Sequence, residues 1–208
     1  MRRSTFHMKE QEEIEAFLQE MTFGFLGTYG EDGYPHMTPL NFAYANGAFY
    51  MHGSRVGQKM NNLRANPRVT FAVAKEFALI PSYWIDPEIA CPATAFFKSV
   101  FVRGEAVVVE EAEEKASAFE AFMRKLQPEG GYEPITPDHP RYAKELKAVA
   151  LLKIVVHDMT AKFKFGQNWS ETRIEDIAGR LDDRGRGLDA ETAELMKRFC
   201  PHHRILPD

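Results

Sequence analysis

The chain has 208 residues, of which 44% are hydrophobic and 27% are charged, a composition typical of a globular protein with a buried core. This length suits one domain, or one domain with an appended helical tail, and excludes a fusion of two enzymes. The 26 Lys and Arg residues against 30 Asp and Glu residues give a net charge of -4, so no overall positive field favours nucleic acid or an anionic membrane. We therefore expect small-molecule partners.

The N-terminal part of the chain predicts a helix followed by a sheet. Apolar residues at helical spacing among Glu and Gln predict an amphipathic helix over residues 10–21. A short helix over residues 56–65 and a further strand over residues 68–74 come later. Between the two helices, apolar runs joined by tight turns predict three antiparallel strands, over residues 23–29, 34–44 and 48–52.

The middle of the chain begins with a Pro-rich segment, residues 77–94, which we expect to form a long irregular loop that covers a site. Residues 96–110 predict a long strand with a bend at Gly104, and residues 111–126 predict an amphipathic helix. A second Pro-rich connection spans residues 130–140.

The C-terminal part predicts a short helix near residues 141–147, strands over residues 149–158 and 160–165, and then polar helices. From residue 170 on, this pattern predicts a tail rather than part of the core. Strands grouped in meanders, with helices inserted between them, favour a mainly β (α+β) antiparallel barrel with flanking helices over a doubly wound parallel sheet.

Cysteine content and the N-terminal sequence bear on location. The two cysteines, Cys91 and Cys200, cannot form a disulfide framework. The first residues lack the apolar stretch of a signal peptide, and no apolar run has the length needed to span a bilayer. We expect a cytoplasmic protein.

An anion site is predicted where the third strand ends, in the segment HGSRVGQK over residues 52–59. We expect Ser54 to cap the following helix, whose backbone N–H groups attract negative charge. Arg55 and Lys59, four residues apart, are expected to share one helix face. This arrangement suits a phosphate, although the spacing is not that of a Walker A loop. The alternative is an ordinary capped helix with solvated Arg and Lys.

A second candidate segment, residues 33–42, carries Pro35 and Pro39 within a predicted strand. Because proline cannot donate to a strand ladder, we expect an edge strand or a bulge there. Exposed backbone of this kind can contact a flat ligand. A bulged edge strand without any ligand is the alternative.

Together these segments carry a family resemblance. They read, in order, G-x-P-H-x-x-P-x-x-F, A-N-G-x-F-Y-x-H-G-S-x-x-G-x-K and N-P-x-V-x-F. This order resembles the FMN-binding split barrels of the pyridoxamine 5′-phosphate oxidase-like superfamily, and most of all its nitroimidazole-resistance branch. Residues 91–104 and 162–168 are similar to two further segments of related flavin-binding proteins. The resemblance covers residues 8 to 170, most of the chain.

The resemblance implies a homodimer of six-stranded antiparallel split β-barrels with one FMN in each groove between the subunits. The split-barrel domain would span residues 1–169, and a C-terminal helical tail would span residues 170–208. The phosphate would lie near Lys59, the isoalloxazine ring would lie along the strand at residues 38–41, and the partner subunit would reach across near residue 167. The implied cofactor-binding residues are Thr38, Pro39, Leu40, Asn41, His52, Gly53, Ser54, Arg55, Lys59, Lys98, Ser99, Gln167 and Trp169.

His52 and the C-terminal segment with Cys200, His202 and His203 contain residue types that can carry chemistry. His52 is the candidate catalytic residue, since a histidine titrating near neutrality beside a flavin can donate a proton during reduction; a neutral hydrogen-bonding role is the alternative. Cys200, His202 and His203 include metal-ligand types, but no second Cys or His pair lies at a structural-zinc interval, so we predict no metal site.

The function expected from this combination is a cytoplasmic FMN-dependent oxidoreductase. It would pass electrons from a reductant, with NAD(P)H as a candidate, to a small organic acceptor such as a nitro compound. The paired-arginine substrate segment of the pyridoxamine phosphate oxidases is missing near the C-terminus, which argues against pyridoxamine phosphate as substrate. A flavin-binding sensor or regulator with little turnover is one alternative, and a haem or deazaflavin in place of FMN is another.

Overall fold

The computed structural model describes residues 4–202 of the chain. The chain forms two compact units. The main unit comprises Glu10–Val73 and Val100–Thr160, and the terminal unit comprises the described residues of Met1–Lys9, Ala74–Ser99 and Ala161–Asp208.

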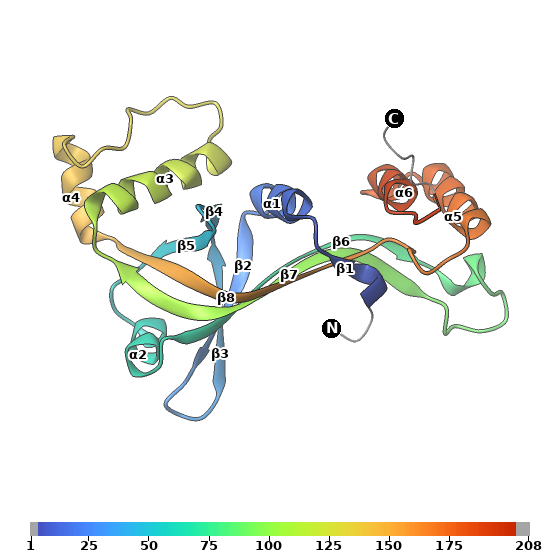
Figure 1. Cartoon of the computed structure of the whole chain (residues 1–208), viewed down its shortest axis with the longest axis horizontal. Helices are drawn as coiled ribbons and strands as arrows, with labels where there is room; N and C mark the ends of the chain where they lie inside the picture. The colour runs from blue at the N-terminus through green and yellow to red at the C-terminus, as the bar shows by residue number, and fades with distance from the viewer. Residues whose placement is uncertain (1–3, 203–208) are drawn as a thin grey trace. The chain divides into compact units, whose positions relative to one another are not determined.

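Eight strands form one sheet in the order β3-β2-β6-β7-β8-β5-β4, with β1 paired to β8 (Figure 1). The pairs β1–β8, β2–β3, β2–β6, β4–β5 and β5–β8 are antiparallel. The strands are β1 (His7–Met8), β2 (Phe23–Tyr29), β3 (Pro35–Asn41), β4 (Ala43–Ala45), β5 (Ala48–Gly53), β6 (Arg68–Ile80), β7 (Thr94–Val109) and β8 (Ala150–Lys164).

Six α-helices accompany the sheet within residues 4–202, so the α+β class is confirmed. No helix in this part of the chain combines the length and the apolar character that crossing a membrane requires. The helices are α1 (Gln11–Glu20), α2 (Gln58–Ala65), α3 (Ala112–Leu126), α4 (Pro140–Ala148), α5 (Glu171–Arg184) and α6 (Asp189–Arg198), and two 3₁₀ turns lie at Ser4–Phe6 and Ser82–Trp84.

An antiparallel sheet with flanking helices is consistent with the predicted split barrel, but its six strands are not confirmed. The described sheet has eight strands, and its order ends at β3 on one side and at β4 on the other without pairing between them. Two of the strands, β1 and β4, have only two and three residues. The sequence merged β3 and β4 into one run because the pattern stays apolar through Phe42, where the chain passes from one strand to the next.

Three further boundaries differ from the predictions. β6 continues to Ile80, so the irregular segment begins at Pro81 rather than at residue 77. The two strands predicted over residues 149–158 and 160–165 form one continuous strand, β8. The polar residues His157 and Asp158 lie within this strand and do not interrupt it. β1 was not predicted, since two residues carry no readable period.

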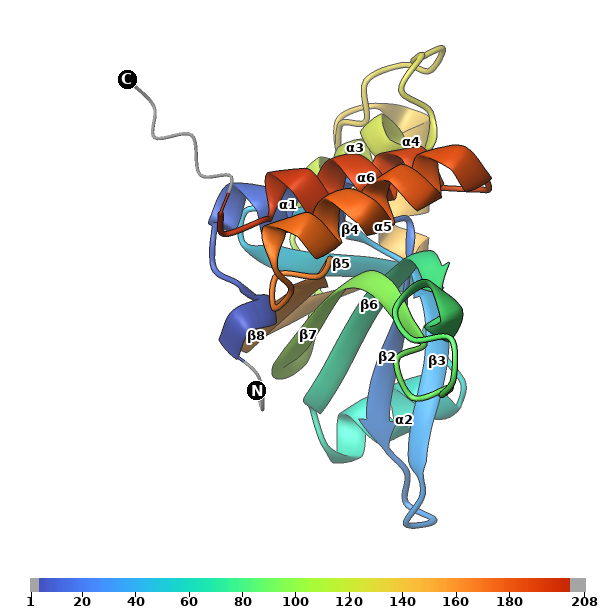
Figure 2. The same ribbon diagram turned by 90° about the vertical axis from the view of Figure 1, so that its right-hand side faces the viewer.

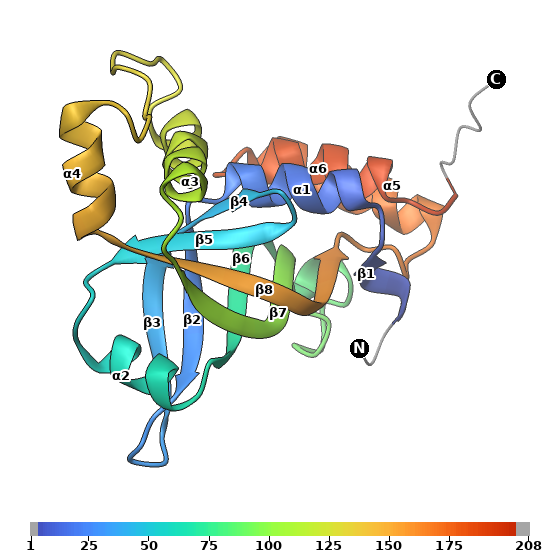
Figure 3. The same ribbon diagram turned by 60° about the vertical axis from the view of Figure 1, so that its left-hand side comes forward.

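The core of the main unit contains a cluster of aromatic rings. Phe71 meets Phe42 at 5.3 Å and Phe49 at 5.4 Å between ring centroids. Gly24 on β2 lies against this cluster, and a Cβ there would come within 2.3 Å of the Phe71 ring, so this position requires glycine. In Figure 3, α1 and α3 lie over β4 and β5, which places their apolar faces on this side of the sheet.

The terminal unit has a core of its own, built by α5 and α6, which pack side by side (Figure 2). Ile174, Ile177 and Leu181 on α5 are fully buried. Phe165, at the end of β8, stacks on Phe199 at 5.7 Å. The two helices are therefore part of a core rather than a loose tail; the domain boundary between residues 169 and 170 stays a prediction.

One ion pair closes the turn between α5 and α6. Arg184 donates from Nε and Nη2 to the Asp189 carboxylate at 2.7 and 2.6 Å, and from Nη1 to the Leu79 carbonyl at 2.8 Å. The guanidinium lowers the pKa of Asp189. Gly185, between the two, takes the left-handed conformation (φ 57°) that ends α5.

Candidate functional site

The predicted anion segment forms the loop between β5 and α2 in the main unit. β5 ends at Gly53, and α2 begins at Gln58 after Gly57, whose φ of 109° suits glycine alone. No side chain caps this helix terminus, so its first backbone N–H groups have no side-chain acceptor. The chain thus presents the positive end of a helix dipole beside a glycine-rich loop.

Lys59, the second residue of α2, lies directly after this loop. Its side chain is half-buried, and burial lowers the pKa of its ammonium group. Within residues 4–202, that ammonium forms no hydrogen bond and no ion pair. A Cβ placed on Gly53 would lie 3.0 Å from Lys59 Nζ, so glycine keeps the backbone open beneath the charge. A half-buried cation without a protein partner is suited to an anionic ligand.

His52 precedes this loop on β5 and packs against α3. Its ring lies 5.2 Å from Phe122, edge on, and 5.6 Å from Phe119. Desolvation lowers the pKa of His52, and the nearby charge of Lys59 lowers it further. The imidazole is therefore biased toward its neutral form at neutral pH, which favours the hydrogen-bonding alternative over a resident proton donor.

Two details of the predicted anion site are wrong. Ser54 does not cap α2; its Oγ accepts a hydrogen bond from the Val56 N–H at 3.1 Å within the loop. Arg55 does not share a helix face with Lys59, because it lies outside the helix. Its guanidinium instead donates to the backbone carbonyls of residues 147, 148 and 149 at 3.2 to 3.3 Å. The serine remains in the loop as a candidate ligand, whereas the arginine side chain is engaged elsewhere.

The predicted ring-binding strand is an edge strand, as its prolines indicated. β3 pairs with β2 on one side and ends the strand order on the other. Along it, Thr38 and Leu40 are half-buried while Pro39 and Asn41 are exposed. The Asn41 side chain donates to the Thr22 carbonyl at 3.0 Å, which anchors the end of the strand.

The remaining predicted cofactor residues belong to the terminal unit. Lys98 is buried on β7, with its ammonium 5.1 Å from the Phe163 ring, and Ser99 follows it half-buried. The Gln167 amide donates to the Phe163 carbonyl at 2.7 Å and accepts from the Phe165 N–H at 2.8 Å. Trp169 packs on Phe96 at 5.4 Å. Gln167 and Trp169 therefore already have contacts within their own unit.

A polar contact that the sequence analysis missed lies beside the first residue of α2. His36 Nε2 on β3 lies 3.1 Å from the Asp32 carboxylate and 3.3 Å from Gln58 Nε2. The bond to His36 lowers the pKa of Asp32. These contacts tie the tip of the β2–β3 hairpin to the first turn of α2, next to Lys59.

Two lysines on α3 were also missed. Lys115 donates to the Leu146 carbonyl at 2.9 Å, and Lys125 donates to carbonyls near the end of α1. The signal was present in the sequence, because both lysines fall in the helical stripe defined by Ala118 and Phe122. A lysine inside an apolar stripe indicates either a buried partner or a ligand.

Within residues 4–202, no group of three or more His, Cys, Asp and Glu side chains has the arrangement of a metal site. Cys200 is buried, and His203 lies outside the described residues.

Residues 10–163 match the pyridoxamine 5′-phosphate oxidase family, and the chain belongs to that family. It is 27% identical to protease synthase and sporulation protein PAI 2 of Bacillus subtilis (strain 168) over 199 residues, which covers 92% of this chain and 94% of that protein. The superfamily inferred from the sequence motifs is thereby confirmed.

Two solved structures share the fold. The first is a protein of Bacteroides thetaiotaomicron VPI-5482 assigned to 5-nitroimidazole antibiotic resistance, which is 24% identical, with a TM-score of 0.59 over 75% of this chain and 85% of the other. The second is the FAD and haem binding protein of Mycobacterium smegmatis, which is 17% identical, with a TM-score of 0.63 over 83% of this chain and 79% of the other. The predicted branch is thus among the proteins of the same fold.

Proposed function

We propose that the chain binds FMN and acts as an oxidoreductase that passes electrons from a reductant, such as NAD(P)H, to a small organic acceptor. Membership in the pyridoxamine 5′-phosphate oxidase family supports a flavin, and so does the shared fold with a protein that binds FAD and haem. The fold shared with a nitroimidazole-resistance protein supports a nitro compound as one class of acceptor.

The observation that carries this proposal is that the ammonium of Lys59 has no hydrogen-bond or ion-pair partner among the described residues. It lies next to the open backbone of Gly53, just after the start of α2, where the uncapped backbone N–H groups add positive potential. A phosphate monoester supplies the acceptor oxygens and the negative charge that this loop lacks. We assign the FMN phosphate to Lys59, Ser54 and the backbone of this loop.

The remaining residues would position the cofactor. Bound flavin supplies the electron-transfer chemistry, and the protein supplies orientation and electrostatics. The edge backbone of β3 from Thr38 to Asn41 would lie along the ring. Without the cofactor, the lowered pKa of His52 favours the neutral imidazole beside this phosphate site. A phosphate beside Lys59 would offset that lowering and let His52 carry a proton.

A homodimer with FMN at the subunit interface is part of this proposal. Phe23, Phe25 and Tyr29 on β2 are 44 to 61% exposed, and Met37 on β3 is 58% exposed. The register pairs Phe25 with Pro39 and Gly27 with Met37, so these side chains share one face of the hairpin. An exposed apolar face of this kind is typical of a surface covered by another chain. Light scattering tests this, with Phe25→Asp expected to give a monomer and an unchanged dimer counting against the assigned face.

The visible spectrum of the purified protein tests the cofactor. We expect flavin bands that are released on denaturation, or are regained on addition of FMN, and tighter binding of FMN than of riboflavin, which lacks the phosphate. A Soret band without flavin bands would indicate that the protein binds haem in place of flavin. A protein that takes up no flavin would contradict the proposal. Anaerobic addition of NAD(P)H should bleach the flavin absorbance. Later addition of a nitroaromatic should restore the absorbance of the oxidised flavin.

A second candidate function is a flavin-binding regulator with little turnover. The similarity over 92% of this chain to a protein named protease synthase and sporulation protein PAI 2 supports a role linked to sporulation. A flavin that stays oxidised under NAD(P)H would support this candidate and exclude the NAD(P)H-dependent reductase.

A further inference from the structure

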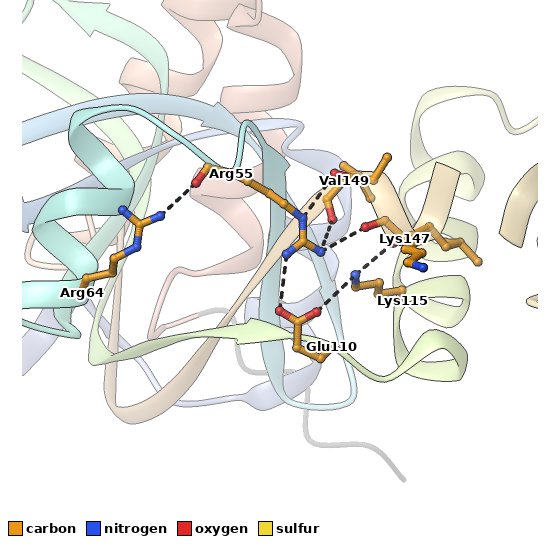
Figure 4. Close-up of polar contacts among 8 residues, drawn as sticks. Arg55, Arg64, Glu110, Lys115, Lys147 and Val149 are labelled. Atoms are coloured by element: carbon orange, nitrogen blue, oxygen red, sulfur yellow. Dashed lines mark hydrogen bonds and ion pairs between the residues drawn. The ribbon is translucent and has the colours of Figure 1, made fainter. Parts of the chain in front are cut away.

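A second positively charged site lies beside the C-terminus of α4 in the main unit. The structure contains there a cavity of about 480 Å³. Its charged lining residues are Arg55, Glu110, Lys115 and Lys147, three cations and one carboxylate (Figure 4). Neither Lys59 nor Ser54 is among the lining residues, so this cavity differs from the proposed phosphate site, although Arg55 of the same loop lines it.

Lys115 is the buried charge of this cavity. It is 2% exposed, and its ammonium donates one hydrogen bond, to the Leu146 carbonyl at 2.9 Å. Its other contact is with the Glu110 carboxylate at 3.9 Å, which is longer than a hydrogen bond. Because an ammonium group has three N–H donors, donors remain for a ligand within the part of the chain that the structure describes.

Arg55 also lines this cavity, and several hydrogen bonds hold its guanidinium in place. Its guanidinium donates to the carbonyls of Lys147, Ala148 and Val149, and its Nη1 lies 3.5 Å from Glu110. Together with Lys115 it supplies donors to the final carbonyls of α4, which offsets the negative end of that helix. Because a helix terminus carries only about half a negative charge, it cancels only part of the positive charge of Arg55 and Lys115.

The net charge of the lining residues is +2 in a chain whose net charge is -4. A neighbouring cavity of about 360 Å³ shares Arg55 and Glu110 and adds a further cation, Arg64, whose Nη2 donates to the Arg55 carbonyl at 3.1 Å. Among residues 4–202, Glu110 is the single carboxylate that lines either cavity, and its side chain is 65% exposed.

The rest of the wall is apolar. The remaining lining residues are Ala112, Pro137, Ala143 and Leu146. A cavity of this size holds a small molecule, and an apolar wall with a few convergent charges is the usual pattern of a ligand site. We propose that this cavity binds a small organic anion, a carboxylate or phosphate monoester with a short apolar body.

Isothermal titration of the full chain at low ionic strength tests this proposal. The probes are benzoate, phenyl phosphate and uncharged benzyl alcohol, which share one ring and differ in charge. We expect saturable binding of at least one anion and none of benzyl alcohol, and the two anions separate carboxylate from phosphate recognition. Absence of saturable binding of both anions would overturn the proposal.

Variants locate the site. Lys147→Ala should weaken anion binding about tenfold, since an exposed charged donor is lost. Ala143→Phe, which fills the cavity from the same helix, should abolish it. Lys144→Ala, an exposed lysine of α4 that does not line the cavity, is the matched control and should bind like the unmodified chain.

The Lys59→Ala variant separates this site from the proposed flavin site, and anion binding at the cavity should survive it. If binding is lost in Lys59→Ala and kept in Lys147→Ala, the anion occupies the loop before α2 and this proposal is wrong. Unchanged affinity in both Lys147→Ala and Ala143→Phe would also overturn it.

Discussion

Lys59, just after the start of α2, and Lys125, at the end of α3, are two half-buried lysines with opposite surroundings. Burial lowers the pKa of both, to about 8 for Lys125. The Lys125 ammonium donates to the carbonyls of Leu18, Met21 and Phe42 at 2.8, 2.7 and 3.3 Å, and it lies 4.2 Å from the Phe42 ring centroid. Lys59 has no such partner within residues 4–202.

The difference shows that a lowered pKa alone does not identify a binding residue. Lys125 completes the C-terminal end of α1, where backbone carbonyls lack partners of their own, and its role is structural. Burial also disfavours the charge of Lys59, but no such bonds offset this effect within residues 4–202, which is why we propose that a ligand is its partner. Three experiments test this contrast.

The largest effect is expected from Lys125→Met. Removing the ammonium leaves the carbonyls of Leu18 and Met21 without this donor, which should lower the free energy of unfolding by about 2 kcal/mol at pH 7. Chemical denaturation measures this loss. Flavin affinity should stay unchanged, because the residue lies outside the proposed phosphate loop.

Arg124→Met, an exposed neighbour on the same helix, is the control and should stay within about 0.5 kcal/mol of the unmodified chain. The pH profile adds a second readout. Since the folded pKa of Lys125 lies below its unfolded value, the unfolded state binds more protons between pH 8 and about 10.4, and stability should rise with pH there. If the Lys125→Met variant still becomes more stable between pH 8 and about 10.4, another titrating group is responsible for the increase.

A smaller effect is expected from Lys59→Met, and on a different quantity. FMN affinity should fall by about tenfold or more, as expected for loss of a charged hydrogen bond to phosphate. The free energy of unfolding should stay equal or rise slightly, because a half-buried charge without a partner is removed. Fluorescence titration with FMN and with riboflavin measures the first effect, and only FMN should respond.

Lys59→Met could instead lower the free energy of unfolding as much as Lys125→Met does and leave the flavin affinity unchanged. That result would show that Lys59, like Lys125, has a structural role. Ser54→Ala is the companion variant, and it should weaken FMN binding less, because its hydroxyl also serves the Val56 N–H.

The smallest effect is the pH dependence that His52 confers. Its pKa is lowered in the folded chain, so the unfolded state binds more protons as the pH falls below about 6.5. Stability should therefore decrease with acidification in that window, and His52→Gln should remove part of the decrease. Added FMN should also reduce it, because a phosphate beside Lys59 favours the protonated imidazole. Denaturation curves at pH 5 to 7 with and without FMN test both statements.

Much of this architecture could be predicted from local sequence. The prolines of β3 correctly indicated an edge strand, since proline leaves a ladder position without a donor. The glycines and the lysine at residues 53–59 correctly placed a loop that leads into a helix. These features depend on neighbours along the chain.

Long-range partners could not be predicted in the same way. The Arg55 side chain reaches carbonyls more than ninety positions away, and no local pattern specifies that choice. The helices after residue 170 were expected to be a tail because their exposed faces are polar. Phe199, directly after α6, stacks on Phe165, directly after β8, and the local pattern did not connect these two distant rings.

The three longest strands also determine how the chain can be divided. The chain passes between its two compact units four times, after residues 9, 73, 99 and 160. β6, β7 and β8 each contain one of these passages, so neither unit is a continuous stretch of sequence. A chain shortened after residue 169 would lose Phe199, the aromatic neighbour of Phe163 and Phe165. Such a fragment should aggregate, and any exchange of modules between relatives must keep both units together.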